Sequence, residues 1–310
     1  MSRSRTALFD TFARLPGTVR GAIWMLGASL CFGTHGVWVR FAVAEGADPL
    51  VVSFWRSLVF FLLLLPWILA NRRTALRSAH PVGQLLRAAF SMAGLVLLVL
   101  AQANLPLAEV SALTFAAPLF GTMGAALLLG EVVRARRWIA TLVGFAGVWV
   151  VLRPGVSDVS LLFALPLISA LFIAGSNLMI RYLAKDDAPT TTVAWLAVAA
   201  VPFTLVPALF AWQWPSPMAF FWMAMLGAAG LGAHICLVRA FTAAEASAVL
   251  PYDYSRLIVT SSLGFFIFAE VPTIWTWIGG AIIVAAVVYI ARQERRASRR
   301  PARTFTPPRA

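Results

Sequence analysis

Four residues near the end of the chain combine charge and aromatic character inside an otherwise apolar stretch, 246–269. Asp253 and Arg256 are three residues apart, so on a helix they share a face, and Tyr252 and Tyr254 flank the acid. A charge at the centre of a membrane helix costs about 2.5 to 3.5 kcal/mol, so such a group meets a partner or a water-filled path. The pattern predicts either a pair that neutralises itself or a site where Arg256 binds a carboxylate or phosphate through two hydrogen bonds.

Other polar or aromatic side chains interrupt apolar stretches and are candidates for the same site: His35, Trp38, Arg56, Asn177 and His234. Arg56, beside Trp55, either lines a binding site or extends its guanidinium outward to the membrane surface. The others either line a pathway or serve in packing and hydrogen bonding between helices.

A nucleophilic site is a rival interpretation. Ser176, next to Asn177, could be activated by His234 as a general base, which would make the protein an intramembrane hydrolase. Nothing in the sequence fixes the separation of Ser176 and His234. The phosphate-binding pattern G-x-x-x-x-G-K-[ST] is missing, and Cys31 and Cys236 lie in apolar stretches without metal-ligand spacing. The sequence therefore predicts no nucleotide site, metal or other cofactor, and it favours a protein that is not an enzyme.

The segments that hold these residues are long enough to span a membrane. Of the 310 residues 61% are hydrophobic and 12% are charged, whereas soluble domains average about 25% charged. A spanning helix needs about 20 mostly apolar residues. The sequence supplies ten such segments, at 21–43, 49–70, 82–104, 107–130, 136–152, 159–182, 189–211, 217–239, 246–269 and 272–291. We therefore predict an all-α membrane protein with ten transmembrane helices.

The basic residues gather on one side of these segments. The net charge is +13, and all 25 Lys and Arg residues except Arg40, Arg56, Arg153 and Arg256 lie in the terminal segments or near the ends of even-numbered spans. The positive-inside rule then predicts a multi-pass protein of a bacterial-type inner membrane with both termini cytoplasmic. We expect the basic tail, 293–310, to be disordered and to attract anionic membrane lipid rather than nucleic acid.

The two halves of the sequence resemble each other. L-A-E-V-S-A-L at 107–113 matches A-A-E-A-S-A-V at 243–249, and each is followed by an apolar span that ends in a lone acid, Glu131 or Glu270. We expect these acids to bond to backbone or cap a neighbouring helix. Each half has an odd number of spans, so the second half must enter the membrane inverted.

The repeat predicts a particular organisation of the chain. It consists of a cytoplasmic segment 1–20, a first five-helix repeat 21–155, a second five-helix repeat 156–292 and the tail 293–310. By this repeat, Asn177 corresponds to the region of His35.

Longer stretches match a known pattern. They are A-E-V-S-A-L-T-F-A-A-P-L-F from residue 108, G-E-V-V from 130, W-I-A-T-L-V-G-F-A-G-V-W-V-V-L-R-P-G from 138, and P-Y-D-Y-S-R-L-I-V-T-S-S-L-G-F-F-I-F-A-E-V-P-T from 251. Over nearly the whole chain, these stretches resemble the EamA type of the drug/metabolite transporter superfamily.

One departure concerns proline. Pro118 precedes Glu131 as in the family pattern, but Leu257 holds the equivalent place before Glu270, and the proline is Pro251. The second-half helix is therefore expected to bend at a different position.

The predicted function is secondary transport of a small polar or amphipathic metabolite by alternating access, with the site between the two halves. A passive channel is the other alternative. Energy would come from exchange, from the substrate's own gradient or from protons carried by Asp253 and His35. The resemblance implies carriers of amino acids, vitamins, cofactors, metallophores or nucleotide-like compounds in either direction, so it selects neither a substrate nor an oligomeric state.

Overall fold

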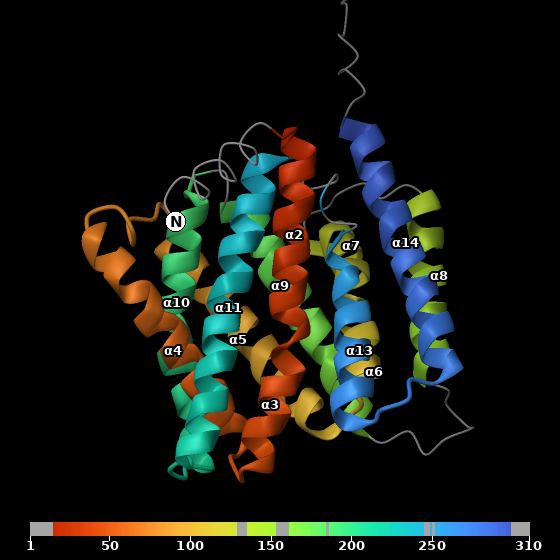
Figure 1. The fold of residues 1–310 in the computed structure, drawn as a ribbon. Helices are drawn as coiled ribbons and strands as arrows, with labels where there is room; N and C mark the ends of the chain where they lie inside the picture. The colour runs from red at the N-terminus through yellow and green to blue at the C-terminus, as the bar shows by residue number, and fades with distance from the viewer. Residues whose placement is uncertain are drawn as a thin grey trace, which may run out of the picture.

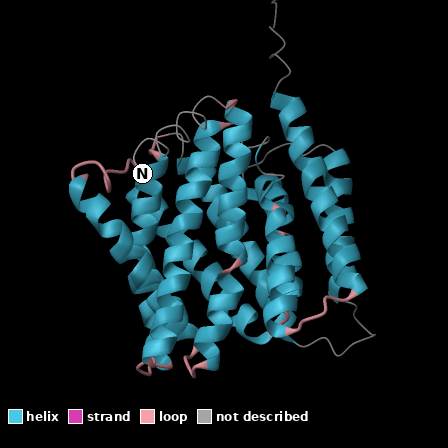
Figure 2. Cartoon of the chain, viewed as in Figure 1, coloured by secondary structure: helices cyan, strands magenta, loops and turns pink. Residues whose placement is uncertain are grey.

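The structure is a computed structural model, described over residues 15–128, 135–152, 161–183, 186–244, 249 and 252–298. Within these ranges the regular secondary structure is entirely helical (Figure 1; Figure 2). In chain order the helices are α2 (Gly17–Gly33), α3 (His35–Ala44), α4 (Pro49–Ala70), α5 (Pro81–Asn104), α6 (Leu107–Thr114), α7 (Ala117–Leu128), α8 (Ala135–Leu152), the 3-10 turn η1 (Leu161–Phe163), α9 (Ala164–Leu183), α10 (Pro189–Phe210), α11 (Pro217–Ala243), α13 (Ser255–Phe268) and α14 (Ile274–Ser298).

These helices supply the ten predicted spans. In the described ranges, seven stretches are long and apolar enough to cross a membrane, and three shorter apolar helices, Trp138–Leu152, Ser255–Phe268 and Ile274–Ile290, complete the set. α2 begins and α14 ends at the same face of the bundle, here called the inner face, and α3 ends at the opposite, outer face (Figure 1). The bundle exposes large apolar side chains such as Phe266 at its surface, as a lipid-facing surface requires.

Three predicted spans are interrupted. The span predicted as continuous over 107–130 is divided into α6 and α7 at Phe115 and Ala116, because Pro118 cannot donate a hydrogen bond to the carbonyl of the preceding turn. The span predicted over 246–269 contains α13 only from Ser255 onward, after a turn at Tyr254. Tyr254 lies three residues before Leu257, just as Phe115 lies three residues before Pro118, so among the described residues the second half bends at the equivalent position and the predicted shift of the bend is wrong; Pro251 lies outside the described residues.

The first predicted span, 21–43, is also divided. α2 and α3 meet at Thr34, whose hydroxyl donates to the carbonyl of Cys31 (2.8 Å). Such back-bonding by a threonine competes with the regular helical pattern and bends helices. Backbone groups in the interior are consequently released from the helical pattern at this point.

The two halves of the chain approach each other closely along α2 and α13. A Cβ at Gly33 would lie 2.6 Å from Cγ1 of Val259, so only glycine fits there. The hydroxyl of Thr260 donates to the carbonyl oxygen of Gly33 (3.3 Å), and the hydroxyl of Ser29 donates to Oδ1 of Asp253 (3.3 Å). The carbonyl freed by the break between α2 and α3 is therefore satisfied by the other half of the chain.

A partly buried ion pair ties the helices together at the outer face. Arg40 on α3 pairs with Glu270, which follows α13, and donates through Nε to the carbonyl of Gln102 (3.0 Å). The second carboxylate oxygen of Glu270 accepts the backbone N–H of Leu107, the first residue of α6 (2.9 Å). Glu270 therefore caps a neighbouring helix, which confirms that prediction, whereas Glu131 lies outside the described residues.

A hydrogen-bonded aspartate ties the halves at the inner face. Asp187, just before α10, accepts the backbone N–H of Ala79 (2.9 Å), Nε2 of Gln84 (2.7 Å) and the hydroxyl of Ser78. Burial alone would raise the pKa of the Asp187 carboxyl, but these hydrogen bonds and the nearby His80 together hold its pKa below the ordinary value.

Arg87, which the sequence groups with the basic residues of the inner side, is buried. It lies on α5 with 6% of its surface exposed, and its Nη1 donates to the carbonyl of Thr192 on α10 (2.8 Å). This contact joins α5 of the first half to α10 of the second half.

Replacing Glu270 with Ala should lower the free energy of unfolding by about 1 to 3 kcal/mol, because it leaves the Arg40 guanidinium without its counter-charge and the Leu107 N–H without an acceptor. Glu270→Gln keeps a hydrogen-bond acceptor and should lower the free energy of unfolding by less than Glu270→Ala. Thermal unfolding in detergent measures both. Glu45→Gln, which changes an exposed acid on the same face, is the control; a loss as large at position 45 as at 270 would contradict the role of this network.

Asp187 should make stability depend on pH. Its pKa is lower in the folded protein than in the unfolded chain, where it is about 3.9, so its contribution is present above that value and is lost as pH falls through the folded pKa. Asp187→Asn should lower the free energy of unfolding by about 1 to 2 kcal/mol at pH 7. The difference in stability between this variant and the wild type should shrink below about pH 4. Unfolding temperatures measured across pH, with the exposed Glu45→Gln as control, check this; a difference that stays constant with pH would refute it.

Candidate functional site

The interrupted helices bring cationic and aromatic side chains together inside the bundle. Phe32 and His35 flank the break between α2 and α3, Phe115 lies at the break between α6 and α7, and Tyr254 and Arg256 lie where α13 begins. α4 and α11 contribute the remaining members. We call the following set the central cluster: Phe32, His35, Arg56, Phe60, Phe115, His234, Tyr254 and Arg256.

Arg256 is held between aromatic rings. Its guanidinium carbon lies 4.8 Å from the ring centroid of Phe115 and 5.8 Å from that of Phe32. The ring of Tyr254 meets Phe115 edge-on, with centroids 5.1 Å apart. Cation–π contacts of this kind orient a guanidinium while leaving its N–H groups available to a ligand.

Of the two alternatives predicted for Asp253 and Arg256, the self-neutralising pair is not found. Asp253 and Arg256 both lie in described ranges, and no ion pair joins them although they are three residues apart. The turn at Tyr254 interrupts the helix between them, so the face-sharing that regular spacing implies does not apply. Asp253 instead accepts a hydrogen bond from Ser29 on α2.

Arg56 is buried, so it does not extend to the membrane surface. Only 6% of the residue is exposed, and its Nε is buried without a hydrogen-bond partner in the described part of the chain. α4 packs against α11 at two glycines: a Cβ at Gly227 would lie 2.9 Å from the carbonyl oxygen of Arg56, and a Cβ at Gly230 would lie 3.2 Å from its Nη2. The small residues leave room for a guanidinium between the two helices.

The two histidines lie on either side of Phe32. His35 and His234 both meet that ring edge-on, with centroids 5.5 Å and 5.6 Å away. Phe60 contacts His234 from α4, at 5.3 Å. Nδ1 of His234 lies 2.9 Å from the carbonyl oxygen of Gly230, whereas Nε2 of His35 is buried without a partner in the described ranges.

The central cluster contains cations that no carboxylate of the described residues neutralises. Arg56 and Arg256 both act electrostatically on His35, and neither arginine has a carboxylate partner within the described ranges. A buried charge without a partner is costly, so the arrangement favours a ligand that supplies oxygen acceptors. The aromatic rings around the two arginines offer flat surfaces for a planar ligand.

The other predicted site residues lie outside this cluster. Trp38, one turn beyond His35, stacks on Trp222 of α11, with centroids 5.7 Å apart and planes 15° from parallel. Tyr252 is 44% exposed. Asn177 is exposed on α9, and no hydrogen bond or ring contact joins it to the cluster within the described ranges.

The serine–histidine pair of the hydrolase interpretation is not assembled. Ser176 is buried on α9, which packs mainly against α5, α6 and α7. His234 is on α11, where it hydrogen-bonds Gly230 and contacts Phe32 and Phe60. No hydrogen bond joins Ser176 to His234, both of which lie in described ranges.

Sequence reasoning missed the three phenylalanines of the cluster, Phe32, Phe60 and Phe115, although it identified Tyr254. The residue type did not single out Phe32 and Phe115, because the chain has 22 phenylalanines. A signal for both was present, because Phe32 precedes Gly33-Thr34 and Phe115 precedes Pro118, the residues that interrupt their spans. An aromatic residue at a predicted helix break is therefore a better candidate than one in an uninterrupted span.

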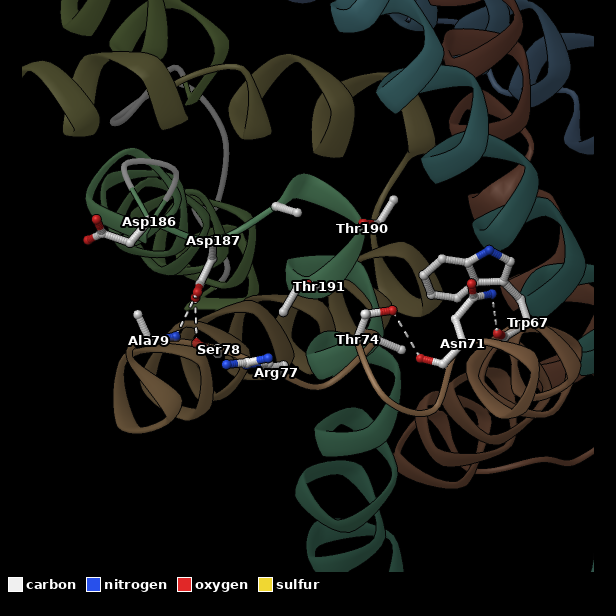
Figure 3. Close-up of a pocket in the computed structure, with 12 residues that line it drawn as sticks. Trp67, Asn71, Thr74, Arg77, Ser78, Ala79, Asp186, Asp187, Thr190 and Thr191 are labelled. Atoms are coloured by element: carbon white, nitrogen blue, oxygen red, sulfur yellow. Dashed lines mark hydrogen bonds between the residues drawn. The ribbon is translucent and has the colours of Figure 1, made fainter.

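A separate pocket of about 670 Å³ lies at the inner face (Figure 3). Asp187 hydrogen-bonds Ser78 and Ala79 on one side of it, and on the other side Asn71 donates to the carbonyl of Trp67 (2.9 Å). These polar groups are engaged with one another. The pocket contains none of the sequence-predicted site residues, so the central cluster is the stronger candidate.

Comparison with known proteins agrees with the duplicated helical fold. The model of the EamA-like transporter family matches the chain twice, over residues 19–153 and 160–292. A solved crystal structure with 18% sequence identity superposes with a TM-score of 0.61, covering 89% of this chain and 98% of the other, which supports the fold alone.

Curated relatives are similar along almost their whole length. A riboflavin transporter of Vibrio cholerae serotype O1 is 33% identical over 287 residues, covering 91% of this chain and 96% of that protein. An S-adenosylmethionine uptake transporter of Rickettsia prowazekii is 26% identical over 278 residues, covering 90% and 94%. With two family matches that together span most of the chain, this protein belongs to the EamA-like transporter family and is a multi-pass secondary transporter of small metabolites.

Proposed function

We propose that the chain carries riboflavin, or a closely similar flavin, across the cell inner membrane by alternating access, with the central cluster as the binding site. The observation that carries this proposal is the pair of arginines without carboxylate partners among aromatic rings: Arg256 between Phe32 and Phe115, and Arg56 near Phe60. A flavin is planar and aromatic and carries ring carbonyl oxygens that accept hydrogen bonds. Its chemistry therefore complements this cluster.

The same charges argue against S-adenosylmethionine. That compound carries a sulfonium cation, which two unpaired guanidinium groups would repel at close range. The relative named as a riboflavin transporter is also the more similar of the two compared, at 33% against 26% identity. Both arguments favour the flavin.

Residues from both halves of the chain contribute to the proposed site. Phe32 and Arg56 belong to the proposed first repeat, 21–155, and His234 and Arg256 to the second, 156–292. Because the repeats are inverted, one arrangement of the halves exposes the site inward and the alternative exposes it outward. The Arg40–Glu270 pair joins the halves at the outer face, so opening outward requires that this pair separate.

The proposed orientation places both chain ends in the cytoplasm. α2 begins and α14 ends at one face, and Arg72, Arg73 and Arg77 lie in the connection between α4 and α5 at that face (Figure 1). The basic residues of segments 1–20 and 293–310 adjoin the start of α2 and the end of α14 in the sequence, and their charge is suited to anionic lipid headgroups.

Riboflavin uptake into proteoliposomes should fall at least tenfold in Arg256→Ala, because the variant loses the cation between Phe32 and Phe115. Arg72→Ala, which removes an exposed inner-face arginine, should leave uptake unchanged. Counterflow of labelled riboflavin against its gradient distinguishes a carrier from a channel. Wild-type protein that accumulates S-adenosylmethionine but no riboflavin would overturn the proposed substrate.

Coupling to protons is proposed to use Asp253. Its carboxylate accepts a hydrogen bond from Ser29 in the other half of the chain, so protonation would change a contact between the halves. Asp253→Asn should abolish the stimulation of uptake by an imposed proton gradient while leaving exchange of labelled for unlabelled substrate intact. Gradient-dependent uptake that survives in Asp253→Asn would rule out this role.

A further inference from the structure

We propose that Arg56 and His234 form a subsite that recognises the imide edge of the substrate, the O=C–N–H–C=O sequence of a pyrimidine-dione ring. In this subsite Arg56 donates to a ring carbonyl and Nε2 of His234 accepts the imide hydrogen. The inference rests on the proposed function, because a flavin carries such an edge. It adds which residues determine specificity and which chemical group they select.

Arg56 supplies unused donors. It is 94% buried, yet no hydrogen bond or ion pair to it is present among the described residues, and its Nε is among the buried atoms without a partner. A guanidinium has five N–H donors and no acceptor. Leaving them unsatisfied in an apolar interior is costly, so the group is suited to a ligand that brings carbonyl oxygens.

His234 supplies an acceptor. The carbonyl of Gly230 can only accept a hydrogen bond, so Nδ1 of His234, at 2.9 Å, carries the hydrogen. In the neutral ring Nε2 then has a free lone pair, and no hydrogen bond to it is present in the described part of the chain. Phe32 and Phe60 meet the imidazole edge-on, with interplanar angles of 70° and 76°, and fix its orientation.

The guanidinium of Arg56 and the imidazole of His234 are neighbours, because both adjoin one residue and the charge of Arg56 acts on the imidazole. Gly230 bonds His234 through its carbonyl, and a Cβ at Gly230 would lie 3.2 Å from Nη2 of Arg56. The missing side chain leaves room for the guanidinium beside the imidazole. An imide presents an acceptor next to a donor, which is the complement of a guanidinium beside an imidazole lone pair.

A phosphate or carboxylate fits this subsite less well. When fully ionised it would match Arg56, but it would direct its negative oxygens at the lone pair of His234 and would have no hydrogen to donate. The subsite therefore favours an uncharged imide over an anion. Riboflavin 5′-phosphate and riboflavin provide a direct comparison, since they differ only in the group that this subsite is not expected to bind.

Binding of riboflavin and of riboflavin methylated on its imide nitrogen, measured by fluorescence quenching with the purified full chain, tests the subsite. Wild-type protein should bind the methylated compound at least tenfold more weakly, because the methyl group removes the donor that His234 accepts. His234→Leu should bind riboflavin more weakly and no longer distinguish the two compounds. Arg56→Gln should weaken the binding of riboflavin and of the methylated compound by a similar factor.

Cys236→Ala, on the same helix and outside the central cluster, is the matched control and should retain both affinities. Thermal unfolding of each variant establishes that it is folded, and Arg56→Lys and His234→Gln replace any variant that is not. Equal binding of both flavins by the wild type would overturn the proposal. So would tighter binding of riboflavin 5′-phosphate that is lost in Arg56→Gln, because this would identify a phosphate site.

A failure of the proposed function gives a different result. If the wild type binds no riboflavin, uridine and uridine methylated on its imide nitrogen are compared by titration calorimetry with the same purified full chain. If uridine binds but methylated uridine does not, and uridine binding is lost in His234→Leu, the imide subsite is supported and the flavin is rejected as substrate. Binding of neither flavins nor uridine would reject both proposals.

Discussion

Charged groups in an apolar interior need partners, and this requirement governs the arrangement of the helices. The interior charges have different partners. Arg40 forms an ion pair with Glu270, Asp253 accepts a hydrogen bond from Ser29, and Arg256 makes cation–π contacts with two aromatic rings. Arg56 and Arg256 have neither a counter-charge nor a hydrogen bond within the described ranges, and Arg56 also has no cation–π contact there. A transporter has a reason to retain such a residue, because the substrate can supply the missing partner and leave again.

Interrupted helices make the interior chemically useful. An unbroken helix satisfies its own backbone and leaves little for a ligand, whereas the breaks at Thr34, Phe115 and Tyr254 release backbone groups and redirect side chains. Glycines then allow the halves to approach at these points, as Gly33 does against Val259. The contacts that join the two halves are therefore concentrated where the helices are least regular.

Different contacts join the halves at the two faces. At the outer face Glu270 binds Arg40 and the start of α6, and at the inner face Asp187 binds the residues that precede and begin α5. Alternating access requires that each face can open while the other stays closed. Ion pairs and hydrogen bonds between the halves suit such opening, because water can replace these hydrogen bonds when a face opens. Apolar surfaces that separate gain no such compensation.

The sequence by itself determined the ten spans and the duplicated halves, because hydropathy and repetition can be recognised directly from the order of the residues. It also identified Arg56, His35, His234 and Arg256 as unusual, since a charge or imidazole within an apolar span is recognisable without a structure. Only the tertiary structure decided which of these residues meet. The turn at Tyr254 separates Asp253 from Arg256, and packing at Gly230 brings Arg56 from α4 beside His234 from α11, because contacts between distant segments depend on helix breaks and interhelical packing rather than on spacing along one helix.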